Sequence, residues 1–548
     1  MSHLSPLEIP LLIRETGAPV HRVIPMSPPR EIELKLDVPI HSLPRLTASS
    51  LLRGAAASSR KPVSLASVYY DTKTLKLRRK RLSLRVRRVG RRYVQTIKQE
   101  GDATAALFAR NEREHETRAA EPDLDVAGET ALAPLLSKKL RRRLKPMFET
   151  NVRRKVFQIR HGDSEVELGI DKGTIDAGRK SSPLCELELE LKQGDAADLF
   201  ELAKALAEEV PVHLAVQSKA ERGYALLAAE KPRAVKAAPI TIAPDLNVQS
   251  AFQAIAKACL HQLAANQAVM LDDDPEGLHQ MRVALRRLRA SLSLFSEMLS
   301  DPQTETLKAE FKWITGELGP ARELEIFLKR VVKPATNGKS RGPGVAVVAR
   351  ELRQRREDAL ARARAAVESP RFRRMMLDTA AWIETGEWMR NPDVLACILR
   401  ERPIVEVAAE ELRRRWKKIC KRRGHLRELS ARRRHRLRIQ AKKLRYAAEF
   451  FAGAFPRKKS VRRREKFVAK LEALQDALGD LNDIAVHEQL SERLVDNSDT
   501  GRKRRGDRAK KAFAAGRLSG REEARAEPLL KEAERAHTTV VKAKPFWV

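Results

Sequence analysis

Cysteine and aromatic residues are scarce in this chain of 548 residues, and several patterns with a specific chemical meaning are absent. The four cysteines (Cys185, Cys259, Cys397 and Cys420) are far apart and form no C-x-x-C pair. A disulfide framework or a zinc site is therefore not expected, and a reducing compartment such as the cytoplasm is favoured. No apolar run approaches the roughly 20 residues of a membrane-spanning helix, so we expect no membrane partner. A G-x-x-x-x-G-K-[ST] sequence is also missing, which argues against an ordinary P-loop ATPase.

Basic residues are present in large excess, and they are unevenly distributed. The chain contains 108 Lys and Arg against 72 Asp and Glu, a formal net charge of +36. Residues 1–230 hold 40 basic and 31 acidic residues (+9), which leaves 68 and 41 (+27) for residues 231–548. This excess predicts a polyanionic partner. Because aromatic residues make up only 5% and no DNA- or RNA-binding motif is recognised, nucleic acid is expected to bind only non-specifically.

The patterns divide the chain into a strand-rich part and a helical part, which predicts an α+β multidomain fold. We expect a loose extension over residues 1–29, a strand domain over 30–230, a Pro/Ala-rich linker over 231–245 and a helical domain over 246–548. Eight stretches have strand character, and eight strands can close into an antiparallel β-barrel tunnel. They begin at Glu31, Ser67, Leu82, Tyr93, Asn111, Phe148, Ser164 and Leu184. The segments 131–145 and 195–209 between them are predicted to form flanking helices.

Charged residues alternate with apolar ones along several of these strands. Glu31, Glu33 and Lys35 share one face of the first strand. A single strand of this kind is equally typical of a solvated face over a core. Taken together, however, the strands separate acidic faces from basic ones, which favours a lumen with a metal side and a phosphate side. Carboxylates are the ligands that Mg²⁺ and Mn²⁺ prefer, and Arg and Lys bind phosphate oxygens.

The E-I-E-L-K sequence at Glu31 resembles the E-x-E-x-K motif of the CYTH family, the triphosphate tunnel metalloenzymes. The later V-Y-Y-D-T, L-R-V-R, R-E-H-E, D-K-G, E-L-E-L-E-L and S-K-A-E-R-G-Y segments follow that family's order over residues 31–225. The resemblance implies an eight-stranded antiparallel tunnel that uses Mg²⁺ or Mn²⁺. It implies catalytic roles for Glu31, Glu33 and Lys35, and a glycine turn at Gly173. The implied triphosphate-binding residues are Lys35, Arg85, Arg87, Lys98, Arg154 and Lys219. The implied metal-binding residues are Glu31, Glu33, Glu114, Glu116, Asp171, Glu186, Glu188 and Glu190.

Two landmarks repeat in the helical part at nearly the same spacing. The segment HQMRVALRRLR at 279–289 matches HRLRIQAKKLR at 435–445, which begins 156 residues later. LGPARELEIF from Leu318 resembles LGDLNDIAVH from Leu478, which begins 160 residues later. We therefore predict an all-α bundle with a duplicated unit and weakly patterned breaks at 332–345 and 496–520. On a helix the basic residues of each copy share one face, and repeating such mutually repelling charges favours anion binding over a merely solvated face.

These segments resemble the CHAD family, a duplicated helical module, over roughly residues 246–548. The resemblance implies that the domain binds inorganic polyphosphate. The sequence departs from the family at Glu323-Leu324-Glu325, where D-x-D is more usual. The implied polyphosphate-binding residues are His279, Arg282, Arg286, Arg289, Arg322, His435, Arg438, Lys442 and Arg445.

The two resemblances together predict an inorganic triphosphatase that hydrolyses triphosphate to pyrophosphate and phosphate and binds polyphosphate through its helical domain. Three alternatives stay open: a non-catalytic polyphosphate-binding or granule-associated protein, an adenylate cyclase and a thiamine-triphosphatase of the same tunnel fold. Cyclisation of a nucleotide needs a nucleoside pocket, and the low aromatic content argues weakly against one. We expect a cytoplasmic protein, with association with polyphosphate granules as a further possibility.

Overall fold

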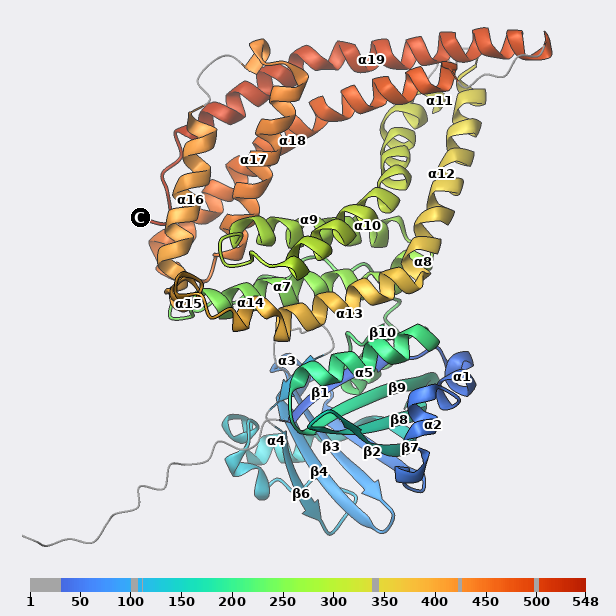
Figure 1. Ribbon diagram of the computed structural model, residues 1–548, viewed down its shortest axis with the longest axis vertical. Coiled ribbons are helices and arrows are strands. Elements are labelled where there is room, and N and C mark those ends of the chain that lie inside the picture. Colours follow the sequence, from blue (N-terminus) through green and yellow to red (C-terminus); the bar gives the residue numbers. More distant parts are fainter. Residues whose placement is uncertain (1–30, 100–106, 111, 338–343, 422–425, 497–501) are drawn as a thin grey trace, which may run out of the picture.

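Figure 1 shows a computed structural model of the chain, in which a sheet domain and a helical domain form two adjoining bodies. The structure describes residues 31–99, 107–110, 112–337, 344–421, 426–496 and 502–548. The predicted extension at 1–29 lies outside the described residues. Residues 231–243 contain neither helix nor strand and lead from one body to the other, where the sequence predicts a linker.

Ten antiparallel strands form the sheet of the first body. They are β1 (Glu31–Asp37), β2 (Val63–Thr72), β3 (Leu82–Val89), β4 (Arg92–Gln99), β5 (Leu107–Arg110), β6 (Glu112–Thr117), β7 (Leu144–His161), β8 (Ser164–Ala177), β9 (Lys180–Gln193) and β10 (His213–Leu214). All eight predicted strands are present, and the two additional ones, β5 and β10, are short. The strand count therefore differs from the prediction, while the antiparallel sheet is confirmed.

The order of the strands is β10-β1-β9-β8-β7-β2-β3-β4-β6, and β5 pairs with β1. β5 and β6 thus pair near opposite ends of this path, β5 with β1 and β6 with β4. Among the described strands β5 pairs only with β1 and β6 only with β4, so the sheet curls round without forming the fully hydrogen-bonded barrel that the sequence predicts.

Helices cover the ends and one face of the sheet. The short helices are α1 (Leu43–Thr47), α2 (Ser50–Gly54), α3 (Lys76–Arg79) and α4 (Lys138–Arg143), and the longer ones are α5 (Ala196–Glu209) and α6 (Lys219–Leu227). The prediction of one helix over 131–145 was wrong: a 3-10 turn occupies Ala133–Leu135, Ser137 then caps α4, and β7 begins at Leu144.

Gly173 does not lie in a turn, which corrects a second prediction. It sits inside β8 opposite Val152 of β7. A Cβ atom added there would lie 1.9 Å from the carbonyl oxygen of Asn151, so the close approach of the two strands requires glycine.

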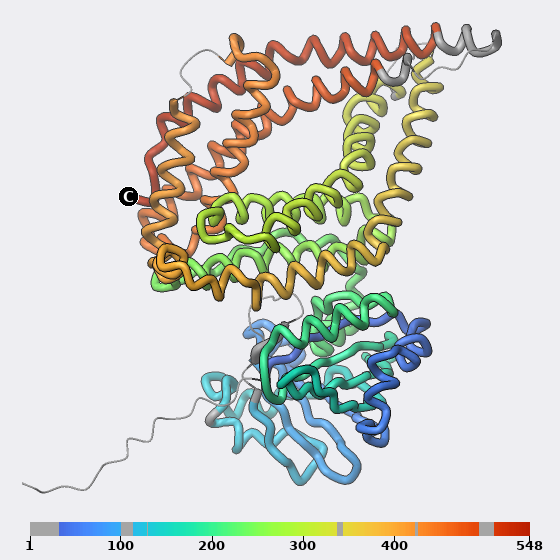
Figure 2. Tube along the Cα trace, in the orientation of Figure 1, coloured from blue at the N-terminus to red at the C-terminus, as the bar shows by residue number. Residues whose placement is uncertain are grey.

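The second body consists of helices. They are α7 (Val248–Ala265), α8 (Gln267–Leu271), α9 (Pro275–Leu294), α10 (Pro302–Phe327), α11 (Lys333–Asn337), α12 (Val345–Glu368), α13 (Pro370–Thr385), α14 (Glu387–Arg390), α15 (Val394–Glu401), α16 (Ile404–Cys420), α17 (Ala431–Phe450), α18 (Lys458–Asp496) and α19 (Arg502–Val541). In Figure 2 these helices follow the sides of a frame, with α18 and α19 side by side along the edge farthest from the sheet. An all-α second domain is confirmed.

The repeated segments fall on corresponding pairs of helices. The two basic copies lie on α9 and α17, and the second landmark of each copy lies on the following long helix, α10 or α18. At the start of the predicted break at 332–345, a π-helical turn at Leu328–Val332 leads into the short helix α11, and residues 338–343 lie outside the described residues. The predicted break at 496–520 was wrong over most of its length, because α19 begins at Arg502 and continues to Val541.

The two bodies are joined by packing as well as by the linker. Helix α5 lies between the sheet and α13, as Figure 1 shows. Arg374 of α13 forms an ion pair with Glu208 at 2.9 Å, and the side chains of Gln267 and His213 lie 3.1 Å apart. One buried apolar cluster continues from Leu187 of β9 through Phe200 of α5 to Phe252 of α7. The sheet and the helices thus share a continuous core.

Candidate active site

A cavity of about 180 Å³ lies inside the curled sheet and is lined almost entirely by charged and hydroxyl side chains. We call it the sheet cavity. The residues that line it are Glu33, Lys35, Tyr69, Ser83, Arg85, Arg87, Lys98, Glu114, Arg154, Glu188, Glu190, Ser218, Lys219 and Ala220. Ten of these fourteen residues are among those that the sequence assigns to the triphosphate or metal site.

The register of the strands explains why these residues meet. Glu33 of β1 lies opposite Glu190 of β9, and Lys35 lies opposite Glu188. Since alternate residues of a strand point to the same face, these four side chains all point into the cavity. Their partners on the other face, such as Leu34, are fully buried in the core.

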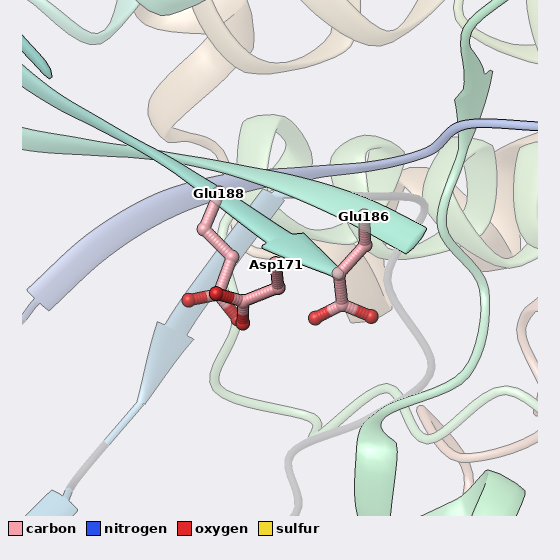
Figure 3. A group of neighbouring side chains, drawn as sticks. All are labelled: Asp171, Glu186 and Glu188. Atoms are coloured by element: carbon pink, nitrogen blue, oxygen red, sulfur yellow. The ribbon is translucent and has the colours of Figure 1, made fainter. Parts of the chain in front are cut away.

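Asp171 of β8 and Glu186 and Glu188 of β9 bring their carboxylates together, and we call them the carboxylate cluster. Each offers an oxygen within 4.8 Å of the others. Figure 3 shows the three side chains extending from neighbouring strands toward the same side of the sheet. Asp171 and Glu186 are buried beneath the cavity lining.

The ammonium group of Lys219 lies in the middle of this cluster. Its Nζ is 2.8 Å from Asp171 and 2.9 Å from Glu188, and it also contacts Glu186. Lys219 is the first residue of α6, whose N-terminus is fixed by a capping box between Ser218 and Glu221. The packing of α6 against β8 and β9 therefore brings a lysine that lies 31 residues beyond Glu188 in the sequence into the acidic cluster.

Arg154 and Lys35 complete the neutralisation of Glu188. The Nε and Nη2 atoms of Arg154 each donate to Asp171 at 2.7 Å, and both Arg154 and Lys35 contact Glu188. Burial disfavours the charged form of Glu188, but Arg154, Lys219 and Lys35 outweigh it and hold the pKa of Glu188 well below its usual value. For Glu186, burial outweighs Lys219, so its pKa is raised.

A wall rich in cations faces this ion-paired side across the cavity. Arg85 and Arg87 of β3 and Lys98 of β4 line it, together with Glu114 of β6. Arg85 lies 3.6 Å from Glu114, and Arg87 donates to the hydroxyl of Ser67 at 3.3 Å. Burial, with the charges of Arg85 and Arg154, lowers the pKa of Arg87 to about 10. Arg87 therefore stays protonated at neutral pH, and a bound anion would stabilise its charged form.

The basic residues of the two helical repeats also meet in space. Helices α9 and α17 pack against each other. Burial is the largest cause of the lowered pKa of Arg438 and of Lys442, and the charge of Arg286 from α9 lowers both further. The pKa of Lys442 falls to about 7. On α9, burial and Arg322 lower the pKa of His279 to about 4, and burial and Arg286 lower that of Arg282 to about 10. We call six residues the α9–α17 basic face: His279, Arg282 and Arg286 of α9, Arg322 of the neighbouring α10, and Arg438 and Lys442 of α17.

A glycine lies beside the equivalent arginine in each repeat. A Cβ atom added at Gly319 of α10 would lie 3.3 Å from Nη1 of Arg282, and one at Gly479 of α18 would lie 3.7 Å from Nε of Arg438. The L-G pair that repeats in the sequence thus leaves space for the arginine of the preceding basic helix.

Comparison with known proteins agrees with this geometry. Residues 29–224 match the CYTH domain family and residues 254–492 match the CHAD domain family. The chain contains a CYTH domain followed by a CHAD domain.

An inorganic triphosphatase from Haemophilus influenzae is 30% identical over 167 residues, which are 30% of this chain and 46% of that protein. The match thus spans less than half of the relative. Among solved structures, the CHAD domain from the plant Ricinus communis shares 28% identity, with a TM-score of 0.47 and coverage of 57% of this chain and 99% of that one. A putative adenylyl cyclase from Hippeastrum with a dominant triphosphatase activity shares 18% identity, with a TM-score of 0.26 and coverage of 37% and 96%.

Three predicted residues of the CYTH domain, Glu116, Asp171 and Glu186, do not line the sheet cavity, and a fourth has a side chain that the structure does not describe. Glu31 is the first residue of β1, and its side chain lies outside the described residues. Glu116 is exposed at the rim, where Arg92 donates to it at 3.0 Å. Asp171 and Glu186 lie beneath the lining, in contact with Lys219.

Sequence reasoning missed four lining residues: Tyr69, Ser83, Ser218 and Ala220. A signal existed for Ser83, because it alternates with Arg85 and Arg87 on β3, and for Ser218, because it begins a capping-box pattern. Tyr69 stacks on Phe148 at 4.6 Å between ring centroids, a contact that the sequence does not indicate.

Three predicted residues of the CHAD domain have other partners. His435 Nδ1 lies 2.6 Å from the side-chain oxygen of Asn482, and Arg445 pairs with Glu449 at 3.1 Å and Glu472 at 3.2 Å. Arg289 is exposed and lies near Lys443, away from the residues of the α9–α17 basic face. Arg322 is paired at 2.9 Å with Glu325, the last residue of the Glu323-Leu324-Glu325 segment at which the sequence departs from the family. Among the helices described, none is long and apolar enough to cross a membrane.

Proposed function

We propose that the CYTH domain hydrolyses inorganic triphosphate to pyrophosphate and phosphate with Mg²⁺ or Mn²⁺, and that the CHAD domain binds polyphosphate. The observation that carries the first part is the sheet cavity, in which six cationic side chains (Lys35, Arg85, Arg87, Lys98, Arg154 and Lys219) converge on a space of about 180 Å³. The resemblance to an inorganic triphosphatase over part of the chain supports the same activity.

The donor set of the cavity fits a hard divalent cation. Glu33, Glu114, Glu188 and Glu190 present carboxylate oxygens to the cavity, the ligands that Mg²⁺ and Mn²⁺ prefer. Glu188 is already neutralised by three cations. Glu33 lies 3.1 Å from Lys35, Glu190 pairs with Lys192, and these two glutamates lie opposite each other outside the carboxylate cluster. Glu33 and Glu190 would therefore hold the metal. When bound, such an ion neutralises phosphate charge and lowers the pKa of a coordinated water.

The chain's own cations supply the remaining stabilisation. Hydrolysis breaks one phosphoanhydride bond, and negative charge builds up on the departing pyrophosphate. Arg85 and Arg87 stand on the wall opposite the ion-paired side, so they can bind the phosphate oxygens without first breaking the pairs of the carboxylate cluster. The attacking water releases a proton, which the carboxylate of Glu33 or Glu190 can accept.

The dimensions of the cavity favour a short phosphate chain over a nucleotide. Pockets for drug-sized ligands typically enclose about 300–1,000 Å³, well above the 180 Å³ found here. Tyr69 is the aromatic residue of the lining, and its ring already stacks on Phe148. This favours inorganic triphosphate over ATP or thiamine triphosphate.

Polyphosphate binding by the CHAD domain is proposed from the α9–α17 basic face. Burial lowers the pKa of Arg282, Arg438 and Lys442, and the charge of Arg286 lowers each further, although Asp483 opposes the fall at Arg438 and Lys442. A polyanion would relieve that repulsion, and Arg and Lys are the side chains that bind phosphate oxygens.

A substrate panel tests the catalytic proposal. The purified chain is incubated with triphosphate, long-chain polyphosphate, ATP and thiamine triphosphate, with Mg²⁺, with Mn²⁺ or with a chelator, and phosphate release is measured. We expect metal-dependent turnover that is fastest on triphosphate. Faster turnover of ATP or thiamine triphosphate would reject the substrate, and no turnover of any compound would favour the non-catalytic alternative.

A further inference from the structure

A second basic pocket opens on the CHAD domain where α16 and α17 meet the end of α9. It has a volume of about 380 Å³, roughly twice that of the sheet cavity. We call it the outer basic pocket. Its polar and charged lining consists of Ser293, Ser296, Arg414, Arg415, Lys418, Arg436, Gln440 and Lys443. Ile439 is the remaining lining residue, so no aromatic ring from the described part of the chain faces the pocket.

The outer basic pocket is separate from the α9–α17 basic face. Arg436 and Lys443 are seven residues apart, so on a helix with about 100° per residue they point in nearly the same direction. Arg438 is two residues from Arg436 and therefore points away from it by about 160°. Neither Arg438 nor Lys442 lines the outer basic pocket. Helix α17 thus carries two distinct basic faces beside its apolar one.

Protein contacts hold part of the outer basic pocket in a fixed arrangement, so it is more than a group of mobile surface side chains. The side chain of Arg415 is 9% exposed, and its Nη2 donates to the carbonyl oxygen of Ser293 at 2.9 Å. Lys443 Nζ donates to the hydroxyl of Ser293 at 3.3 Å. Contacts across α9, α16 and α17 therefore hold two of the cations in place.

Positive charge in the pocket exceeds the negative charge around it. Its lining contains five cations and no carboxylate. Glu411 pairs with Arg414 and Arg415 from the side, and Glu297 lies near Arg414. Burial lowers the pKa of Lys443, and the charges of Arg415, Lys418, Arg289 and Arg414 lower it further. Two nearby carboxylates therefore do not offset this group of cations, and a bound anion would.

We propose that the outer basic pocket is a second binding site for condensed inorganic phosphate, separate from the α9–α17 basic face. Arginine forks, ammonium groups and serine hydroxyls are all donors to phosphate oxygens. The lining offers no ring on which a nucleobase could stack, which favours an inorganic chain over single-stranded nucleic acid. The proposal extends the polyphosphate binding proposed for the CHAD domain, but it uses different residues, so either can fail alone.

Titration of three triple variants tests this site in the full chain. Short linear polyphosphate is added in metal-free buffer with a chelator, and binding is followed by isothermal titration calorimetry. The outer variant carries Lys418→Ala, Arg436→Ala and Lys443→Ala. The face variant carries Arg286→Ala, Arg438→Ala and Lys442→Ala. The matched control removes three exposed basic residues elsewhere in the CHAD domain, namely Lys312→Ala, Lys531→Ala and Arg535→Ala.

We expect the outer variant to lose one binding step or to weaken it by about tenfold or more, as the loss of charge-assisted hydrogen bonds implies. The control should bind as the wild type does, and the face variant should keep the outer step. All five tryptophans (Trp313, Trp382, Trp388, Trp416 and Trp547) lie in the helical body, so thermal unfolding followed by tryptophan fluorescence confirms that each variant is folded.

Two results would overturn the proposal. One is an outer variant that binds polyphosphate as tightly, and at as many sites, as the control variant. The other is an outer variant that loses affinity for single-stranded DNA by the same factor as for polyphosphate, because the pocket would then be an unselective polyanion surface. Normal binding by the face variant, together with a loss in the outer variant, would reject the α9–α17 basic face and leave the outer basic pocket supported.

Discussion

Replacing Lys219 with methionine should destabilise the CYTH domain and make its stability depend on divalent metal. The ammonium of Lys219 is the cation shared by Asp171, Glu186 and Glu188. Methionine has a similar length but no charge, so the Lys219→Met variant keeps much of the packing and removes the shared cation. Three buried or nearly buried carboxylates then keep Arg154 and Lys35 as cationic partners, together with Arg222, which lies 3.9 Å from Glu186.

The size of the effect follows from the burial of the group. Breaking a buried ion pair by removing one partner costs about 3–5 kcal/mol. For a domain of about 200 residues, 1 kcal/mol shifts the melting temperature by roughly 2–4 °C, so we expect a fall of roughly 6–20 °C. A metal ion present at 100 times its Kd stabilises the folded domain by about 2.7 kcal/mol, which is more than half of a loss of about 3 kcal/mol.

Scanning calorimetry of the full chain measures the melting temperatures of both bodies. Tryptophan fluorescence reports only on the helical body, so it identifies which of the transitions belongs to that body. Mg²⁺ should raise the CYTH transition of the variant more than that of the wild type, because the ion can then also bind the carboxylate cluster in addition to Glu33 and Glu190. In the wild type it could enter the cluster only by displacing the ammonium of Lys219. The double variant Lys219→Met/Glu186→Gln serves as the control, since it lacks one ligand and should respond less to the metal.

Lowering the pH gives an independent test. In the wild type, Lys219 and Arg154 lower the pKa of Asp171 despite its burial, so its contribution to stability is lost as the pH falls through that lowered value. In the variant the clustered carboxylates hold protons more tightly than in the unfolded chain, so acidification from pH 7 to 5 should stabilise it relative to the wild type. An unchanged melting temperature, or equal metal responses of variant and wild type, would refute the placement of Lys219 within the carboxylate cluster.

Three further predictions concern the two proposed binding functions. Glu33→Gln should abolish metal-dependent triphosphate hydrolysis without lowering the melting temperature, because it removes a cavity carboxylate from the donor set, and wild-type turnover would remove Glu33 from the metal site. Arg87→Ala should weaken triphosphate binding by about tenfold or more in calorimetric titrations. The control Arg88→Ala, which removes an exposed arginine from the other face of β3, should bind triphosphate as the wild type does. Equal affinities of the two variants would refute a role of Arg87 in triphosphate binding. Lys442 has a pKa of about 7 in the free protein, so it should take up a proton when polyphosphate binds, and affinity should fall as the pH rises from 7 to 9. Titrations in buffers of different ionisation enthalpy would detect this uptake, and Lys442→Arg should abolish it while keeping binding; an equal proton uptake in that variant would exclude Lys442 as its source.

Alternation along single strands indicated which charged residues share a face, and the family resemblance supplied the other predicted residues that line the sheet cavity. Glu33 and Lys35 point the same way because they are two residues apart, and the same holds for Arg85 and Arg87. The helical repeat was similarly visible, since the spacing of basic and apolar residues along α9 matches that along α17. Such local periodicity depends only on the geometry of one strand or one helix, so it can be recognised without knowing what lies beside it.

Only the tertiary structure decided which charges neutralise each other. The sequence predicts an acidic metal side, but the packing of α6 places Lys219 between Asp171 and Glu186, so part of that side is ion-paired. Nothing in the local pattern shows this, because the partners come from elements brought together by the shared core. The same reason separates Arg289 from Arg286 although both lie on α9, since the charge of Arg289 acts on Lys443, whereas that of Arg286 acts on Arg438 and Lys442. A charge's role here depends on its neighbours in space, and those are set by the packing of sheet, α6 and helices rather than by spacing along the chain.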